Sequence, residues 1–231
     1  MPAIVIEDRK LHDRLAVYRD RVDAGEYLAR ALVRFRGKDA FVLAIPSGGV
    51  PVGLAVSSRL DLPFDLLIIR KIPIPGYTES GFAAVSQEGD MVLNEPLVRE
   101  LGLSPEEIEV LAEPVHEELL ARNRIFRENR PWPEIAGKTV ILVDDGLASG
   151  YTMLAAVRAV RRRKPSQIVV AVPTASASTI KLLAPQVDTI VCPNIRSGYS
   201  FAVEDAYRNW YDLDRTGVIN SLKSHGLLAK K

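Results

Sequence analysis

Apolar residues gather in five short runs along the chain, each about as long as a strand. Every run is apolar at both odd and even positions, which is typical of a strand covered on both faces. The runs are FVLAI (41–45), LLIIR (66–70), TVILVD (139–144), IVVAV (168–172) and TIVC (189–192). Segments with helical spacing lie between them. The alternation predicts an α/β fold, a parallel sheet flanked by helices with right-handed connections.

The clearest amphipathic helix follows the third run. Its apolar positions recur at the spacing of one helical face. They are Met153, Ala156, Val157 and Val160. Pro165 is expected to end this helix, because proline lacks the backbone N–H that the next turn would need.

One long polar segment, residues 104–130, interrupts the rhythm. Ser104, Pro105 and Glu107 form an N-cap, a proline in the first turn and a capping-box acid, so a helix is predicted to begin here. Pro114 is expected to kink or break that helix. We interpret the segment as a helical insertion and not as a second domain.

The stretch VILVDDGLASGYT (140–152) holds the strongest chemical signal. Asp144 and Asp145 follow a buried strand at its carboxyl end, where α/β sheets bind ligands. A glycine-rich turn and a predicted helix N-terminus come next, and such a terminus suits a phosphate. Gly150 allows close backbone approach, and Ser149 and Thr152 add hydroxyls. The loop would bind an anion, and the two acids would bind neutral hydroxyls or a divalent cation. A sugar phosphate offers both a phosphate and hydroxyls, although a metal-binding phosphotransfer site or a plain turn would also explain the separate pieces.

Composition narrows the classes of function. The 231 residues are 47% hydrophobic, enough for one sizeable core, so residues 1–231 are predicted to form a single domain. Thirty basic and 29 acidic residues give a net charge of +1, which offers no reason to expect nucleic acid as a partner. The single cysteine, Cys192, suits a reducing cytosol, and neither a signal peptide nor a membrane span is expected.

The quoted stretch resembles the signature of the type I phosphoribosyltransferases, which binds phosphoribosyl pyrophosphate (PRPP). The resemblance extends through about residues 18–215, because four more stretches occur in the same order in a widespread group of phosphoribosyltransferase sequences. They are YRDRVDAG (18–25), LAIPSGGVPV (43–52), RKIPIPG (70–76) and IVVAVPTAS (168–176). The fold implied is the type I phosphoribosyltransferase fold, with a core over residues 18–192 and a small C-terminal hood over residues 193–231.

The resemblance also implies a site. Asp144 and Asp145 would hold the ribose hydroxyls and Mg²⁺, directly or through water, and residues 148–152 would wrap the 5′-phosphate. The residues implied in PRPP binding at this loop, besides the two acids, are Gly146, Ala148, Ser149, Gly150, Tyr151 and Thr152.

Two further stretches would bind the pyrophosphate. The turn Ser47–Gly48–Gly49 offers exposed amides, and in the family a cis peptide often precedes the glycines, here Pro46–Ser47. The family usually has arginine or lysine at the position of Ser47, so one cationic contact is missing. Arg70 and Lys71 open a stretch rich in proline and glycine that would serve as a catalytic lid.

The function implied is Mg²⁺-dependent transfer of a phosphoribosyl group from PRPP to a small-molecule acceptor, a nucleobase or similar nitrogen nucleophile, by a cytoplasmic homodimer. An aromatic residue of the hood would stack on the acceptor, and the candidates are Tyr199, Phe201, Tyr207, Trp210 and Tyr211. The acceptor stays open, because Ala148 stands where 6-oxopurine enzymes carry an aspartate. A non-catalytic PRPP or nucleotide sensor is the alternative that Ser47 favours, and a subunit completed by a partner is a third.

Overall fold

The computed structural model describes residues 3–198 and 200–229. Its core is a six-stranded, fully parallel sheet in the order β1-β10-β8-β7-β2-β3. The strands are β1 (Ile4–Ile6), β2 (Ala40–Ala44), β3 (Phe64–Leu66), β7 (Thr139–Val143), β8 (Gln167–Ala171) and β10 (Thr189–Val191). The predicted parallel sheet is therefore confirmed, and β1 adds an edge strand that the apolar runs did not predict.

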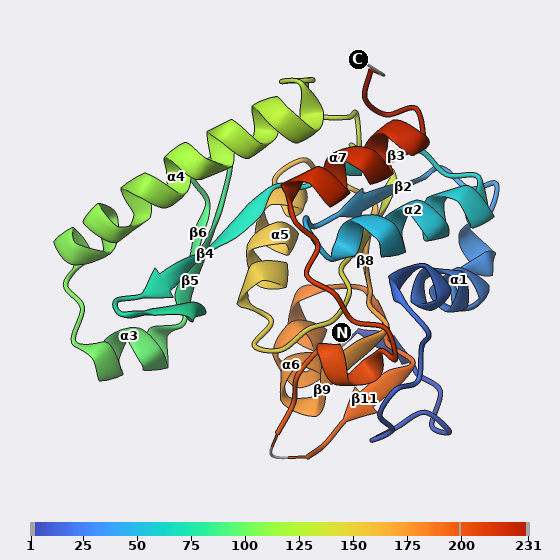
Figure 1. The fold of residues 1–231 in the computed structure, drawn as a ribbon, viewed down its shortest axis with the longest axis horizontal. Helices are drawn as coiled ribbons and strands as arrows, with labels where there is room; N and C mark the ends of the chain where they lie inside the picture. Colours follow the sequence, from blue (N-terminus) through green and yellow to red (C-terminus); the bar gives the residue numbers. More distant parts are fainter. Residues whose placement is uncertain (1–2, 199, 230–231) are drawn as a thin grey trace.

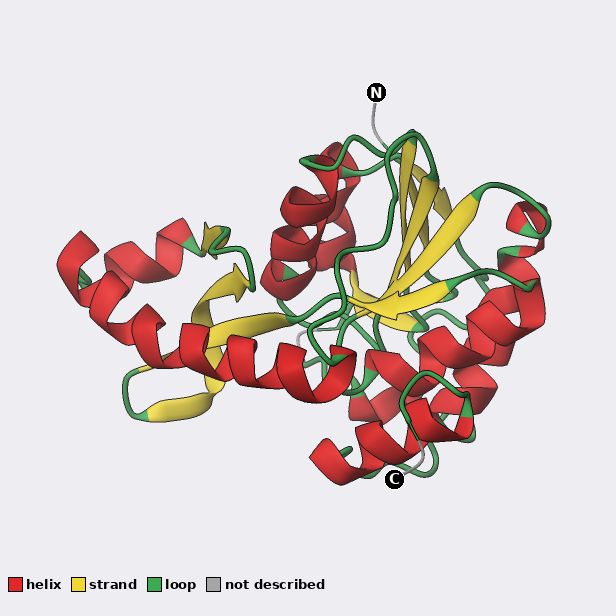
Figure 2. Ribbon diagram, turned by 90° about the horizontal axis from the view of Figure 1, so that it is seen from above, coloured by secondary structure: helices red, strands yellow, loops and turns green. Residues whose placement is uncertain are grey.

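Helices cover both faces of this sheet (Figure 2). One face packs on α1 (Arg21–Ala31) and α2 (Gly49–Leu60), the other on α5 (Tyr151–Arg161) and α6 (Ala177–Leu183). Successive side chains of a strand point to opposite faces of the sheet, so residues at both odd and even positions must be apolar when both faces are covered. Ile141 accordingly belongs to the α1–α2 cluster, and its neighbour Leu142 to the α5–α6 cluster. Short 3₁₀ turns follow α1 and α6, at Val33–Phe35 and Ala184–Gln186.

The run LLIIR is not one strand. β3 ends at Leu66, and the chain crosses two buried residues into β4 (Ile69–Ile74), which belongs to a separate antiparallel sheet with β5 (Tyr77–Ser86) and β6 (Met91–Leu93). We call residues 69–127, this sheet with α3 (Glu95–Leu101) and α4 (Pro105–Arg127), the projecting unit. Figure 1 shows it extending to one side of the core. A continuous apolar run cannot reveal where a chain passes from one sheet to another.

The predicted insertion helix is α4, and its capping box is present. Ser104 Oγ accepts from the N–H of Glu107 at 3.2 Å, and the N–H of Ser104 donates to Glu107 Oε2 at 2.8 Å. α4 is continuous from Pro105 to Arg127, so Pro114 does not break it. Its apolar face, which includes Val115 and Leu119, packs on the projecting sheet, and this burial offsets the bond that proline removes.

The C-terminal part of the chain divides between two places. β11 (Asn194–Arg196) pairs with β9 (Thr174–Ser176), and the 3₁₀ turn Glu204–Ala206 follows. From here on the word hood means residues 174–176, 193–198 and 200–211, a different set from the predicted 193–231. α7 (Arg215–Ser224) instead packs on α2 and α4. The division of the chain into core and hood by sequence position stays a prediction, as does the single domain. No helix among the described residues has the length and apolarity that crossing a membrane requires.

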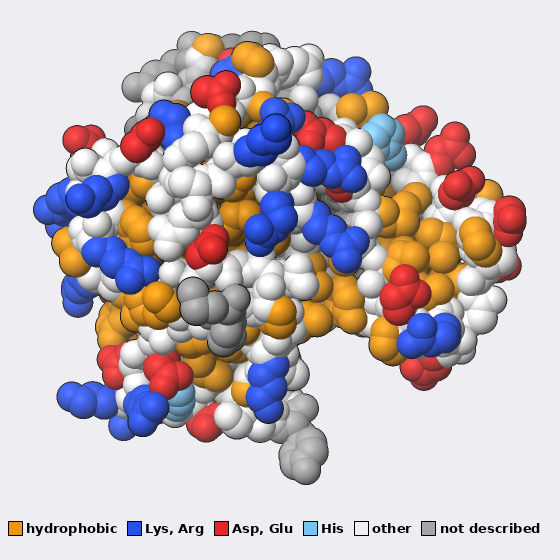
Figure 3. Space-filling model, turned by 180° about the vertical axis from the view of Figure 1, so that it is seen from behind, with side chains coloured by type: hydrophobic (Ala, Val, Ile, Leu, Met, Phe, Trp, Pro, Cys, Tyr) orange, Lys and Arg blue, Asp and Glu red, His pale blue; other side chains and the backbone are white. Residues whose placement is uncertain are grey.

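The back of the molecule differs in character between its two parts (Figure 3). Basic side chains gather over the core, whereas apolar side chains rimmed by acids gather over the projecting unit. A cavity of about 350 Å³ lies between the β4–β5 hairpin and α4, and its lining includes Pro75, Leu103 and Val110. The homodimer implied by the resemblance stays a prediction.

Candidate active site

Asp144 and Asp145 lie at the carboxyl end of β7, as predicted, in the middle of the parallel sheet. Both are half-buried. The carboxylate of Asp144 accepts the backbone N–H of Asp145 at 2.8 Å, which fixes its orientation toward the strand end. The loop that follows is anchored from the hood side, because the N–H of Leu147 donates to the carbonyl of Thr174 at 3.0 Å.

The glycine turn before α2 packs directly against the two acids. A Cβ placed on Gly48 would lie 1.9 Å from Asp145 Oδ2, and one on Gly49 would lie 2.7 Å from the carbonyl oxygen of Val143. No side chain fits in either place, so only glycine allows this contact. The peptide bond between Pro46 and Ser47 is cis, as the resemblance implied. The structure thus brings together two stretches that are about a hundred residues apart in sequence.

Arg21 of α1 completes the surroundings of Asp145. Its Nε donates to Asp145 Oδ2 at 2.8 Å, and its Nη1 donates to the carbonyl of Tyr211 at 2.8 Å. The guanidinium lies 3.9 Å from the ring centre of Trp210. Only 4% of Arg21 is exposed, so its charge is compensated almost entirely by Asp145 and the aromatic face.

Burial raises the pKa of Asp144 well above its ordinary value, and the neighbouring charge of Asp145 raises it further. Two adjacent carboxylates in a poorly solvated place cannot both ionise freely. Because Arg21 compensates Asp145, Asp144 is the acid that retains a proton more readily.

The expected phosphate loop is rigid on one side and open on the other. Gly150 has φ of +80° and caps the N-terminus of α5, so a side chain there would be strained. The carbonyl of Ala148 accepts hydrogen bonds from Thr179 Oγ1 and from Ser176 Oγ, the latter at 3.3 Å. Ala148 and Ser149 are exposed, whereas α6 supports the loop from below. The N-terminal N–H groups of α5 and the loop amides can receive an anion there.

Tyr151 links this loop to the projecting unit. Its hydroxyl donates to Asn94 Oδ1 at 2.9 Å, and Asn94 is the N-cap of α3. Thr152 is half-buried in the first turn of α5.

Comparison with known proteins agrees with this geometry. A model of the phosphoribosyl transferase domain matches residues 18–206. The chain belongs to this family. A Mycobacterium tuberculosis protein, named provisionally as a phosphoribosyl transferase in strains CDC 1551 and H37Rv, is 34% identical over 196 residues, which are 85% of this chain and 44% of that protein. The chain thus spans less than half the length of these curated relatives.

A solved structure is similar over nearly the whole chain. The protein TT1426 from Thermus thermophilus is 32% identical, with a TM-score of 0.73 over 90% of this chain and 98% of that chain. The similarity confirms the fold that the sequence motifs implied.

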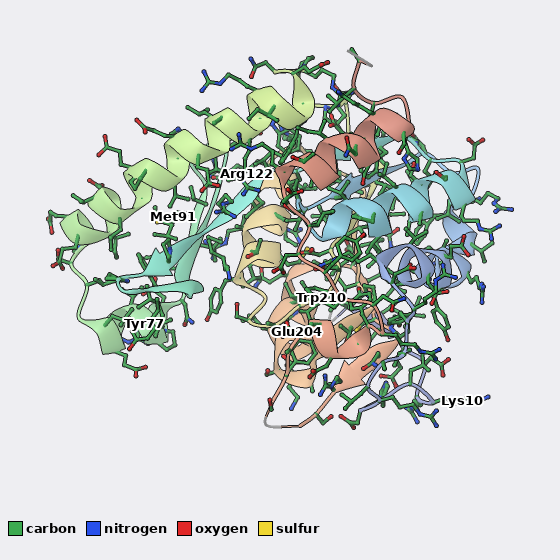
Figure 4. The ribbon with its side chains drawn as sticks, viewed as in Figure 1. Lys10, Tyr77, Met91, Arg122, Glu204 and Trp210 are labelled. Atoms are coloured by element: carbon green, nitrogen blue, oxygen red, sulfur yellow. The ribbon has the colours of Figure 1, made fainter. Side chains whose placement is uncertain are left out.

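Arg70 and Lys71, the two cations expected to belong to a catalytic lid, are successive residues of β4 and therefore lie on its opposite faces. Arg70 Nη2 donates to Glu118 Oε2 of α4 at 3.0 Å, and Arg122 Nε binds the same carboxylate at 2.9 Å (Figure 4 labels Arg122). Lys71 pairs across the sheet with Ala84, which belongs to the cluster on the α5 side. Arg70 is therefore held by α4 in this structure, and Lys71 is on the face of the projecting sheet that packs on α5.

The hood touches the acids through its backbone contacts and aromatic residues. Tyr207 Oη donates to the carbonyl of Asp145 at 2.5 Å, and the ring centres of Trp210 (labelled in Figure 4) and Tyr207 are 5.4 Å apart. Val203 packs against Gly146. Tyr211 remains 51% exposed beside Arg21, so among the described hood aromatics it is the one classed as exposed and open to a ligand. Tyr199, which the sequence also suggested, lies outside the described residues.

The residues present suit a magnesium ion that arrives with the substrate. Among the described residues, no group of three or more acidic, histidine or cysteine side chains is placed to hold a metal. Asp145 is already paired with Arg21, which leaves Asp144 as the other carboxylate. Mg²⁺ is commonly bound by one or two carboxylates together with substrate phosphates, so this pair fits that arrangement.

Arg21 and Val203 were not predicted as site residues, and Tyr207 was predicted only as one of the aromatic residues that could stack on the acceptor. The sequence did hold a signal for Arg21, because it lies on the apolar stripe of α1 with Ala24 and Leu28. A charged residue on such a stripe is expected to be buried with a partner. No comparable signal marks Val203, and the aromatic cluster that marks Tyr207 does not show that its hydroxyl binds the Asp145 carbonyl, because both contacts depend on how the hood folds back.

Proposed function

We propose that the chain transfers the 5-phosphoribosyl group of PRPP to a small nitrogen nucleophile, of which a nucleobase is the leading example. The observation that carries this proposal is the direct packing of the glycine turn at Gly48 on the acids Asp144 and Asp145, with the loop that begins α5 alongside. Two anion-binding backbone segments then flank a pair of hydroxyl-binding acids. PRPP has its phosphate, ribose diol and pyrophosphate in that order.

In the proposed reaction, a nitrogen lone pair of the acceptor forms a bond to C1 of the ribose. The bond from C1 to the pyrophosphate oxygen breaks, and the electron pair leaves with pyrophosphate. Mg²⁺ bound to pyrophosphate would offset its negative charge. Asp144 and Asp145 would hold the ribose hydroxyls, and the amides at residues 48–49 and 149–152 would bind the two anionic ends. The proton of the acceptor nitrogen would pass to solvent.

The test is release of pyrophosphate from PRPP and Mg²⁺ across a panel of nucleobases and simple amines. Gly150→Val is the matched control, because a side chain at φ of +80° beside Thr179 should close the phosphate loop. We expect release with at least one acceptor in the wild type and none in Gly150→Val. Equal release in both would show that another site, or a contaminant, is responsible.

A non-catalytic PRPP or nucleotide sensor is the second candidate, favoured by two observations. Ser47 replaces a cation of the family, and Arg70 is paired with Glu118. Ser47→Arg should add a charge-assisted contact worth about 1.5–3 kcal/mol and tighten PRPP binding roughly tenfold or more. If wild type and Ser47→Arg both bind PRPP tightly and neither releases pyrophosphate with any acceptor, the sensor replaces the enzyme.

A further inference from the structure

Arg21 joins three parts of the chain that are far apart in sequence. It belongs to α1, its Nε binds Asp145 at the end of β7, and its Nη1 binds the carbonyl of Tyr211 in the hood. Trp210 covers its guanidinium plane. Because a guanidinium is planar with N–H groups fixed in a fork, these contacts define its position and direction together.

The contact also fixes Asp145. Its Oδ2 lies between Arg21 on one side and the Gly48 backbone on the other, so the carboxylate has no room to turn. Only 5% of the Arg21 side chain and 13% of the Asp145 side chain are exposed. The hydroxyl of Tyr207 binds the carbonyl of the same aspartate, which makes the hood a second support for it.

We propose that Arg21 is a positioning residue that acts through Asp145: it sets the carboxylate for the ribose hydroxyls and fastens the hood beside it. This role rests on the proposed function, since it requires that Asp145 binds ribose. It goes beyond that function by assigning a task to a residue of the stretch YRDRVDAG, which the reaction scheme leaves without one. The same guanidinium also carries the charge that balances Asp145 before any ligand is bound.

A purely structural ion pair elsewhere in the chain supplies the control. Arg127 of α4 binds Asp65 through Nε at 3.0 Å and Nη2 at 2.8 Å, with side chains 2% and 9% exposed. This pair is as buried as the pair of Arg21 and Asp145 but joins α4 to β3. Arg127→Met and Arg21→Met should therefore lose similar stability, and only Arg21→Met should lose ligand affinity.

The experiment is calorimetric titration of the full chain with ribose 5-phosphate, in wild type, Arg21→Met, Arg21→Lys, Arg127→Met, Asp145→Asn and the double variant Arg21→Met/Asp145→Asn. Circular dichroism identifies a temperature at which all are folded. We expect Arg21→Met to bind at least tenfold more weakly and Arg127→Met to bind as wild type does. Arg21→Lys keeps the charge but cannot reach both partners, so its affinity for ribose 5-phosphate should lie between those of Arg21→Met and Arg127→Met. If Arg21→Met does not fold, Arg21→Lys replaces it in the test.

The double variant decides whether Arg21 acts through Asp145. If it does, removing Arg21 adds no further loss once Asp145 has become asparagine. Additive losses, or wild-type affinity in Arg21→Met, would overturn the proposal. A different failure would concern the proposed function: if Asp145→Asn binds ribose 5-phosphate as tightly as wild type, Asp145 is not a ribose ligand.

A spectroscopic signal gives a second readout. Trp132 and Trp210 are the two tryptophans of the chain, so Trp132→Phe leaves Trp210 as the only reporter beside Arg21. Ribose 5-phosphate should change the Trp210 fluorescence in this background, and Arg21→Met should abolish that change. A ligand-induced change that persists without Arg21 would contradict the link between Asp145 and the hood.

Discussion

Replacing Gly48 by alanine tests the packing of the glycine turn on the acids. Gly48 has φ of −60° and ψ of −34°, a helical conformation that alanine adopts without strain. The added Cβ would however lie 1.9 Å from Oδ2 and 2.3 Å from Cγ of Asp145. The carboxylate must retreat by about 1.5 Å to reach ordinary van der Waals contact. It cannot do so and keep its 2.8 Å hydrogen bond to Arg21.

The magnitude follows from the buried ion pair. Removing one partner of such a pair costs about 3–5 kcal/mol, and displacing Asp145, which keeps some access to solvent, should cost near the lower limit. Alanine offsets about 0.4–1 kcal/mol by restricting the unfolded chain. The net loss of unfolding free energy is then about 2–3 kcal/mol, which lowers the melting temperature by about 5–10 °C in a chain of this size.

Thermal unfolding followed by circular dichroism measures that loss, and titration with ribose 5-phosphate measures the accompanying loss of affinity. Gly198→Ala is the control, because among the described residues a Cβ there meets no atom closer than the Ser200 carbonyl oxygen at 3.8 Å. It should change neither quantity. The reasoning is refuted if Gly48→Ala melts at or above the wild-type temperature and binds the sugar phosphate equally well, since the turn would then not be packed on Asp145.

Three further predictions concern single residues. Asp144→Asn should raise the melting temperature at neutral pH while weakening ribose 5-phosphate binding. Because burial and the charge of Asp145 raise the pKa of Asp144, wild-type stability should fall as pH rises from the ordinary aspartate pKa through the raised value. Melting curves across pH should show this fall in the wild type and not in the variant. Glu118→Gln should release Arg70 and increase kcat/KM for PRPP by up to about fivefold, the worth of a half-exposed ion pair, whereas kinetics of the exposed neighbour Glu117→Gln should match wild type. Tyr211→Ala should raise the acceptor KM about three- to tenfold without changing PRPP affinity, if its exposed ring stacks on the acceptor; an unchanged KM for every acceptor would remove it from the acceptor site.

The sequence predicted the central sheet because burial on both faces imposes a visible pattern. β2, β7, β8 and β10 each fall within a residue of an apolar run. β1 was not predicted, because it is an edge strand of only three residues and exposes Ile4. The change of sheet between β3 and β4 was not predicted either, because an unbroken apolar run looks the same whether it contributes to one sheet or to two.

In the site, the residues whose places depend on their sequence neighbours were predicted, and contacts between distant elements were not. Asp144, Asp145 and Gly150 occupy the strand end and helix start that their own neighbours in sequence define. The position of Arg70 could not be predicted, because its direction depends on Glu118, 48 residues away on α4. The contacts of Gly48 and Arg21 with Asp145 likewise arise from packing between elements.

The distribution of fixed charge makes a last prediction about magnesium. Ser47 contributes no cation to the proposed pyrophosphate site, and Arg70 is paired with Glu118 in this structure. On the ribose side, Asp145 is already compensated by Arg21. PRPP affinity should therefore depend steeply on Mg²⁺, because the metal would supply the positive charge that the pyrophosphate loop lacks. Ribose 5-phosphate, which has no pyrophosphate, should bind equally well with magnesium or with a chelator. Titration of both ligands under the two conditions measures this, and Ser47→Arg should make PRPP binding less dependent on the metal. A ribose 5-phosphate affinity that falls sharply with the chelator would contradict this, because the acids would then hold the metal without any pyrophosphate to share it.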